Sequence, residues 1–296
     1  MQRLSILDAS TLQLVGSRHA KGEGPGEFNS ATAWVAIRKE NVYVYQKLRL
    51  SVFSLKGEYL KRDVRLVDRL LDASALFEAR QSFGMDSAGF LYYLSGRRMA
   101  EFDLVKRSPS GAVTKRLARK QILPDIAPQR GDVGFGVHRN GSIVVTFGHK
   151  PLLATIGSDG KIVWTCDLQE QLPAEFASRL MRRCDEAVAK KLPYYWTNFW
   201  TDDHYTILTD AGPDEPLGIG KPEVYYVFID SQTGVVSAVL FAQQNIVQRL
   251  SKDENDLPSQ TLYAPFAIAH SHGYIYTYCY NLARLVKYNI TWNPRK

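Results

Sequence analysis

The feature that most constrains this chain is a six-residue strand pattern that recurs along it. Each copy begins with a basic residue, continues with mostly apolar side chains, and leads into a short polar turn. Copies lie at residues 3–8, 49–54, 98–103 and 284–289, and residues 226–230 keep the apolar part. A pattern that returns at intervals of roughly 45 to 70 residues predicts a repeat architecture built from equivalent units.

A second recurring element is a nearly continuous apolar strand that stands shortly before each hairpin. A tight polar turn precedes each of these strands, and one more short strand precedes the turn. Strands that are apolar on both faces belong in the middle of stacked sheets. The five copies lie at residues 42–45, 90–93, 143–146, 205–208 and 274–277.

The repeating unit is therefore a four-stranded antiparallel meander, whose strands we name A, B, C and D in chain order. A, B and C are expected near residues 31–55, 81–104, 133–158, 194–230 and 265–290. The first four sets have a D strand and the fifth has none, while residues 3–19 form an extra C–D hairpin. The predicted fold class is all-β: a β-propeller of four-stranded antiparallel blades, in a single domain over residues 1–296.

The connectors between a D strand and the next A strand vary most. Residues 65–80 and 172–191 have helical character, and in the second Leu172, Phe176, Leu180, Cys184 and Val188 recur at i+4 spacing. Pro173 suits a first helical turn. In a propeller the D–A connectors and the B–C loops lie on one face, so the long inserts are expected to gather there.

Composition limits the function classes only loosely. The chain of 296 residues is 45% hydrophobic and has a net charge of +7, which permits an anionic partner without requiring one. Its three cysteines, Cys166, Cys184 and Cys279, form neither a disulfide framework nor the spacing of a zinc site. The sequence contains no apolar run of about 18 residues, so no membrane span is predicted. Met1–Arg3 leads directly into a strand, without the pattern of a signal peptide.

The run Gly22–Phe28 (GEGPGEF) must form a compact turn, because it holds three glycines and a proline. With this turn and the hairpin from Arg49 to Gly57, the chain resembles the NHL-repeat-like six-bladed β-propellers of bacteria. Their repeats combine a G-x-G-x-G-E-F turn with an R-hydrophobic-x-V-F-D-x-x-G hairpin, and Gln46 stands where that pattern has aspartate. The resemblance implies the fold, and roles that range from protein, RNA or carbohydrate binding to a few lyases and lactonases. Similar propellers are often exported.

The strand arithmetic predicts six blades with an incomplete N-terminal part. The last blade lacks a D strand and the first hairpin lacks A and B, so three strands are expected upstream of Met1, together with any export signal. The alternative is a closed five-bladed ring, in which residues 12–19 pair with residues 284–290. Pairing between these two stretches distinguishes the alternatives.

The mouth of the axial channel on the connector face is the predicted ligand site, because polar side chains from several blades converge there in propellers. The B strands are expected to end at Gln46, Ser95, His149, Asp210 and Tyr280, with Arg97, Lys150 and Asn281 in the same loops. The predicted ligand-binding residues are Gln46, Arg97, His149, Lys150, Asp210 and Asn281. The other interpretation is a ring of solvated loop residues.

Other clusters receive structural interpretations. His138, His204, His270 and His272 fall at or beside A–B turns and could suggest a metal, yet turns on separate blades lie far apart, so no metal and no cofactor are predicted. The aromatic run of Tyr194, Tyr195, Trp196 and Trp200 is expected to pack in the core. Lys115, Arg116, Arg119 and Lys120 form a basic cluster that could contact nucleic acid but is interpreted as a solvated connector.

The function predicted from the sequence is that of a non-enzymatic binding or scaffold propeller for a protein, small-molecule or carbohydrate ligand. The alternative is a hydrolase or lyase, resembling lactonases or amidating lyases, that uses the same channel mouth. Such an enzyme needs clustered carboxylates or histidines there, and of the residues in these loops only Asp210 is well placed.

Overall fold

The structure is a computed structural model, in which the described residues form antiparallel sheets and two helices. The described residues are 4–22, 24–28, 34–46, 49–60, 64–65, 83–98, 101–118, 133–147, 151–189, 198–212, 223–243, 267–271, 274–279 and 284–289.

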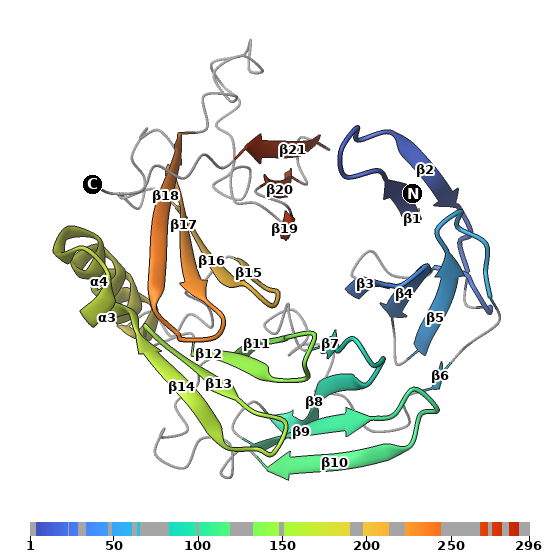
Figure 1. Cartoon of the computed structure of the whole chain (residues 1–296), viewed down its shortest axis with the longest axis horizontal. Coiled ribbons are helices and arrows are strands. Elements are labelled where there is room, and N and C mark those ends of the chain that lie inside the picture. The colour runs from blue at the N-terminus through green and yellow to red at the C-terminus, as the bar shows by residue number, and fades with distance from the viewer. Residues whose placement is uncertain are drawn as a thin grey trace. The chain divides into compact units, whose positions relative to one another are not determined.

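The first compact unit of the chain holds a hairpin and two four-stranded sheets (Figure 1). The hairpin consists of β1 (Leu4–Leu7) and β2 (Leu14–Arg18). The next sheet contains β3 (Trp34–Arg38), β4 (Asn41–Gln46), β5 (Arg49–Ser54) and β6 (Val64–Arg65). The following sheet contains β7 (Phe83–Met85), β8 (Leu91–Arg98), β9 (Glu101–Arg107) and β10 (Val113–Ala118).

The second compact unit holds two more four-stranded sheets and one three-stranded sheet. The first sheet contains β11 (Val133–Val137), β12 (Ile143–Phe147), β13 (Leu152–Ile156) and β14 (Ile162–Asp167). Helices α3 (Leu168–Gln171) and α4 (Ala174–Ala189) follow. The second sheet contains β15 (Asn198–Thr201), β16 (Tyr205–Gly212), β17 (Glu223–Asp230) and β18 (Val236–Gln243). The last contains β19 (Ala267–Ser271), β20 (Tyr274–Cys279) and β21 (Arg284–Asn289).

These sheets confirm the predicted order of strands. Each of the five apolar stretches contributes the second strand of its own antiparallel sheet, β4, β8, β12, β16 or β20. The first strands of neighbouring sheets contact one another, β3 with β7, and β11 with β15 and β15 with β19. Such contacts are expected when first strands are innermost in radially packed blades. Among the described residues the fifth sheet has three strands, and its lack of a D strand stays a prediction.

Three expectations about the wider architecture stay predictions. The described partner of β2 is β1 and that of β21 is β20, so the number of blades stays a prediction. The predicted insert at 65–80 lies, apart from Arg65, outside the described residues. The single domain over 1–296 also stays a prediction. Within the described part of the chain, no helix is both long and apolar enough to cross a membrane.

The cores lie where the face of one sheet packs against the next element. In the first unit, Leu4 and Ile6 of β1 pack with Phe53, Val42 and Val44 of the following sheet. In the second unit, one cluster joins residues of β12–β14, β16–β18, α3 and α4. A fully buried Leu or Phe side chain contributes on the order of 2 kcal/mol, so these inter-element contacts outweigh any single hydrogen bond.

The glycine-rich run Gly22–Phe28 forms the predicted turn, and Arg49 holds it. The Arg49 guanidinium donates to the carbonyl oxygens of Gly24, at 2.6 Å, and Glu27, at 2.7 Å. The Glu27 carboxylate accepts from the Gly24 N–H at 2.7 Å, and Phe28, which is 5% exposed, re-enters the core as expected. The basic residue that opens the strand pattern therefore has a structural role in this sheet. Glycines have no side chains that could hold the turn, and the planar guanidinium of Arg49 holds it by binding two of its carbonyl oxygens.

Neighbouring A–B turns in the first unit are joined by hydrogen bonds to main-chain carbonyls. Arg38, at the end of β3, donates to the carbonyl oxygen of Met85 at the end of β7, at 2.6 Å. The backbone N–H and hydroxyl of Ser87 donate to the carbonyl oxygen of Arg139, at 2.9 and 2.7 Å. The first strands are thus fixed at this end by polar contacts in addition to apolar packing.

The turns after β1 and after β17 have the same geometry but differ at one position. Asp230 accepts three hydrogen bonds from the two residues at i+2 and i+3, and Asp8 accepts four, the additional one from the Ser10 hydroxyl. The residue at i+4 is left-handed in both, with φ of 57° at Leu12 and 73° at Gly234. A side chain with a Cβ atom is strained in this region, so Leu12 stores strain that Gly234 avoids. The hydrogen bonds from Ser10 and Thr11 also lower the pKa of Asp8 to about 2.

Leu12→Gly is expected to raise the free energy of unfolding by about 1 kcal/mol, because glycine relieves the left-handed strain. The measurement is urea denaturation at neutral pH. As the opposite control, Gly234→Ala should lower stability, since its Cβ would come within 2.6 Å of the Trp164 ring at a φ of +73°. A loss of stability in Leu12→Gly would mean that the Leu12 side chain contributes more than the strain costs.

Candidate binding site

The described structure places three of the six predicted ligand-binding residues, and it places them in strands. Gln46 is the last residue of β4, opposite Arg49, as predicted. Arg97 lies within β8 as the unpaired residue of a bulge between Gly96 and Arg98, and Asp210 lies within β16 opposite Tyr225. His149, Lys150 and Asn281, like Tyr280, lie outside the described residues.

Two predicted strand ends were therefore wrong. β8 continues past Ser95 to Arg98, and β16 continues past Asp210 to Gly212. β8 is longer than predicted because its pairing with β9 continues to Arg98, opposite Glu101. β16 is longer because its pairing with β17 continues through Asp210, Ala211 and Gly212, which are polar or small and so end the apolar pattern in the sequence before the strand itself ends. Arg97 is consequently a strand residue and not a loop residue. The convergence of the six side chains at a channel mouth stays a prediction.

The predicted basic cluster is only partly described. Lys115 and Arg116 lie on β10, the last strand of its sheet, and Arg119 and Lys120 lie outside the described residues. The Arg116 guanidinium lies 3.3 Å from a carboxylate oxygen of Asp103 on β9, and both side chains are partly exposed. A surface pair of this kind contributes little to stability. Of the aromatic run, Trp200 is described, and it packs partly buried against a core cluster of β16 and β17, as predicted.

His138 has a structural role in the second unit. It follows β11, is 3% exposed, and its Nδ1 atom lies 2.7 Å from the carbonyl oxygen of Asp202 in the turn after β15. Because a carbonyl oxygen only accepts, Nδ1 carries the proton. The Thr201 hydroxyl lies 3.2 Å from Nδ1, and the Thr206 hydroxyl lies 3.0 Å from that of Thr201. His138 thus links two neighbouring A–B turns.

The remaining histidines do not complete a metal site in the described part of the chain. His204 is an exposed turn residue, His270 lies on β19, and His272 is outside the described residues. Within the described residues no group of three or more His, Cys, Asp or Glu side chains could hold a metal ion. Cys166 is fully buried, and burial raises the pKa of its thiol to about 12.

His138 makes stability depend on pH. Burial lowers its pKa below the ordinary value of 6.5, although the Asp202 carbonyl and the carboxylates of Asp203 and Asp202 oppose the shift. Since the folded state binds this proton less readily than the unfolded state, stability is full above pH 6.5 and is lost as the pH falls toward the folded-state pKa. The buried Nε2 atom has no hydrogen-bond partner among the described residues to receive the added proton.

In His138→Gln, the loss of folding stability that protonation of His138 causes below pH 6.5 is expected to disappear. The difference in free energy of unfolding between the two proteins should change by at most about 1.4 kcal/mol per pH unit below pH 6.5. Urea denaturation at several pH values between 7.5 and 4.5 measures it, and the other titrating groups cancel in the comparison. Parallel pH profiles for the two proteins would show that His138 does not titrate in this range.

The described chain contains one further candidate site, a hollow along helices α3 and α4. Asp167 begins α3 by accepting the N–H of Gln169 at 2.9 Å. Pro173 stands directly before α4 and accepts the Ala177 N–H at 2.9 Å, which confirms the predicted helical insert. Leu172 and Leu180 are buried against the sheets of the second unit, so the opposite side of the insert faces outward.

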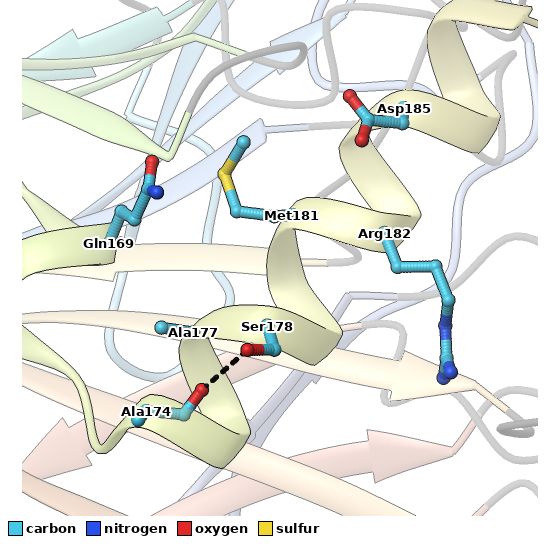
Figure 2. Close-up of a pocket in the computed structure, with 7 residues that line it drawn as sticks. All are labelled: Gln169, Ala174, Ala177, Ser178, Met181, Arg182 and Asp185. Carbon is cyan, nitrogen blue, oxygen red and sulfur yellow. Dashed lines mark hydrogen bonds between the residues drawn. The ribbon is translucent and has the colours of Figure 1, made fainter.

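The hollow has a volume of about 770 Å³ and a mixed lining. Alanines and Met181 supply apolar surface, and Gln169, Ser178 and Asp185 supply an amide, a hydroxyl and a carboxylate. Figure 2 shows Met181 extending from α4 toward the side of Gln169, whereas Arg182 extends in the other direction. The Ser178 hydroxyl donates to the Ala174 carbonyl at 2.8 Å. The described lining residues are Gln169, Ala174, Ala177, Ser178, Met181, Arg182 and Asp185.

Sequence reasoning did not identify these residues, although a signal was present. Ala174, Ala177, Ser178, Met181, Arg182 and Asp185 recur at the i+3 and i+4 spacing of one helix face. The apolar positions of the same segment predict which face of the helix is buried. The residues on the opposite face were not considered as a possible site.

Gln171, at the end of α3, fixes the insert to β18. Its side-chain oxygen accepts the N–H of Val236 at 2.7 Å, and its side-chain nitrogen donates to the carbonyl oxygen of Gly234 at 3.3 Å. β18 is the last strand of its sheet, so this amide satisfies an N–H of a strand edge. The position of α3, and with it one side of the hollow, depends on this pair of contacts.

Gln171→Met is expected to lower the free energy of unfolding by about 1 kcal/mol, because the side chain keeps its length but loses both hydrogen bonds. Gln169→Met is the matched control, since Gln169 is an exposed residue of α3 with no side-chain hydrogen bond in the described structure. Urea denaturation of both variants measures the effect. Equal stability of the two variants would show that the Gln171 amide does not fix the insert.

Comparison with known proteins identifies the class of fold. The chain matches no protein-family model and no curated protein sequence. A member of the DUF4221 family from Bacteroides vulgatus superposes with a TM-score of 0.57 and 10% identity, over 97% of this chain and 86% of that chain. Together with the sheet topology, this similarity shows an all-β protein of antiparallel blades, the architecture of the β-propellers.

Two more distant solved structures have TM-scores below 0.5. One is a protein of unknown function from Bacteroides caccae, with a TM-score of 0.43 and 12% identity, over 79% of this chain and 73% of that chain. The other is a catalytically inactive virginiamycin B lyase from Staphylococcus aureus with quinupristin, with a TM-score of 0.45 and 9% identity, over 95% and 75% of the two chains. Neither bears on the activity of this chain.

Proposed function

We propose that this protein is a non-enzymatic binding propeller, which holds a small-molecule, carbohydrate or protein ligand on the face formed by its B–C loops and D–A connectors. The observation that carries the proposal is the insert after β14. A D–A connector has become two helices, which bury one side against the sheets and line, with residues that include the buried Ala177, an open hollow of about 770 Å³ with apolar and polar lining. Mixed lining with a few polar groups is typical of ligand sites.

The same proposal assigns the channel mouth to ligand binding through Gln46, Arg97, His149, Lys150, Asp210 and Asn281. The support comes from the repeat: all six stand at or after the second strand of a blade, where the B–C connections of a propeller converge. Arg97 and Asp210 carry the charges that would orient a ligand. The bulge at Arg97 supports the assignment, because bulges often redirect a side chain beside a functional site.

The finer classification is part of the proposal. A six-bladed, NHL-repeat-like propeller is supported by the Gly22–Phe28 turn and by its clamp, since Arg49 joins the glycine-rich part of the pattern to the hairpin part. Roles in binding are common among such propellers, and an enzyme of the lyase or lactonase type is the alternative.

A panel of oligosaccharides, short peptides and acidic metabolite analogues, screened by thermal shift and then calorimetry, tests the proposal. Arg97→Ala and Asp210→Ala are expected to weaken a mouth ligand about tenfold each, which corresponds to about 1.4 kcal/mol, while Gln169→Ala and Asp185→Ala leave it unchanged. The reverse pattern would move the site to the hollow. Cleavage of a panel compound would favour the enzyme and overturn the non-enzymatic assignment.

A further inference from the structure

The turn between β11 and β12 contains the only Asn-Gly dipeptide of the sequence, Asn140-Gly141. Asn140 is exposed, whereas Gly141 is buried and has a left-handed backbone, with a φ of 84°. Asparagine is one of the thermolabile residues of proteins, because the backbone nitrogen of the following residue can attack its side-chain carbonyl carbon. A following glycine has no side chain to hinder this attack, so Asn140 is the asparagine of this chain with the least steric protection.

The turn between β7 and β8 is an equivalent of this turn within the same chain. Gly89 stands at the position of Gly141 and has the same φ of 84°, and the exposed Ala88 stands at the position of Asn140. The two turns differ at the glycine nitrogen. The Gly89 N–H donates to the carbonyl oxygen of Asp86 at 3.1 Å, whereas the Gly141 N–H makes no hydrogen bond to any described residue. The atom that would attack is therefore held in one turn and not in the other.

Other described turns show that a bonded glycine N–H is the usual arrangement in this chain. Gly57, Gly111 and Gly160 each donate to the carbonyl oxygen three residues before them, at 2.9 Å. Gly160 follows Asp159, whose side chain is open to the same attack, but the Asp159 carboxylate also accepts the N–H of Lys161 at 3.0 Å. Both reacting groups are thus held at Asp159-Gly160, which makes that dipeptide a second internal reference.

We propose that Asn140 is a site of spontaneous covalent modification, at which deamidation to isoaspartate loosens the contact between the turn that follows β11 and the turn that follows β7. Arg139–Gly141 and the sheet of β7–β10 belong to the same compact unit, so the contact lies within one body. The modification requires no enzyme and no cofactor. It is independent of the proposed ligand site.

The reaction consumes one water molecule and releases one ammonia molecule. The backbone nitrogen of Gly141 forms a bond to the Cγ atom of Asn140, the bond from Cγ to the side-chain nitrogen breaks, and ammonia leaves with the proton that the Gly141 nitrogen has lost to solvent. Water then opens the cyclic imide. Opening at the side-chain carbonyl gives aspartate, and opening at the main-chain carbonyl gives isoaspartate, in which the main chain runs through the former side chain.

Isoaspartate has a consequence here because the turn is held by its main chain. The N–H and the hydroxyl of Ser87 donate to the carbonyl oxygen of Arg139, at 2.9 and 2.7 Å. Isoaspartate at Asn140 adds a methylene group to the main chain between Arg139 and Gly141. On the Gly141 side there is no space for it, since a Cβ atom there would lie 2.8 Å from the hydroxyl oxygen of Tyr92, which is 2% exposed. The added length therefore displaces the Arg139 carbonyl from Ser87.

Incubation of the full-length chain at mildly alkaline pH, followed by peptide mapping with mass spectrometry, measures the rate of amide loss at each asparagine. The matched reference is Ala88→Asn, which places an asparagine before Gly89, and Asp159→Asn is a second reference if that variant fails to fold. Loss at either reference position is expected to be about fivefold slower than at Asn140, because the hydrogen bond of the glycine N–H must first break. Equal or faster loss at the reference position, or an Asn140 amide that persists while other asparagines react, overturns the proposal.

The structural consequence is measured on the isoaspartate fraction, which ion exchange separates and an isoaspartate-specific methyltransferase identifies. Hydrogen exchange at the Ser87 N–H should be faster than in the unaged chain, and the urea midpoint should be lower. Asn140→Asp is the control that adds the charge without lengthening the main chain, and it should keep both values. Unchanged Ser87 exchange in the isoaspartate fraction, or an equal change in Asn140→Asp, overturns the loosening of this contact by the longer main chain.

Discussion

A four-stranded antiparallel sheet whose middle strands are apolar on both faces cannot be stable alone, and the rest of this structure depends on that constraint. Val144, Leu153 and Val227 are completely buried, yet they belong to two different sheets of the same cluster. Each sheet therefore needs a neighbour on either side. The repetition of the unit along the chain is the consequence, since only stacking of similar sheets covers every face.

Polar contacts then fix how neighbouring sheets meet, and they use different side chains for the same purpose. In the first unit a guanidinium of Arg38 and a hydroxyl of Ser87 each reach a carbonyl oxygen of the next A–B turn. In the second unit the imidazole of His138 does so. Because the acceptor is main chain, any donor of suitable length satisfies it, which explains why the A–B turns share little sequence while their connection is retained.

The sequence allowed the strands to be predicted because burial imposes a regular pattern on them. Strand order, the second-strand assignments and the helix at Ala174–Ala189 were all correct. What could not be predicted depends on contacts between distant segments. Arg97 became a strand residue through a bulge, and the clamp of Arg49 on Gly24 joins residues far apart in the sequence. Neither the bulge at Arg97 nor the contact between Arg49 and Gly24 can be predicted from a local sequence pattern.

In the candidate sites too, residue types could be recognised from the sequence, but their surroundings depend on contacts between distant segments. His138 appeared to be a candidate ligand by residue type, but its position between two turns makes it a buried connector with one nitrogen bonded to main chain. The hollow at α3 and α4 was missed because polar residues on a helix are ordinarily just the solvated face. Only the arrangement of Gln169 on one helix and Met181 on the next brings these residues to the edge of one open hollow.

The helical insert stabilises the sheets on its inner side and presents exposed residues on its outer side. Through Gln171 it covers part of the edge of β18, and through Leu172 and Leu180 it completes a core, so it must stay in place for the blade to be stable. Two of its outward residues carry none of this burden, because Gln169 and Asp185 are exposed and make no side-chain hydrogen bond within the described structure. Substitutions of Gln169 and Asp185 can therefore change what binds there at little cost in folding energy, whereas substitutions of Leu172 or Leu180 on the inner face cannot. A connector that is anchored on one side and exposed on the other is the place in this fold where specificity can diverge while the blades stay the same.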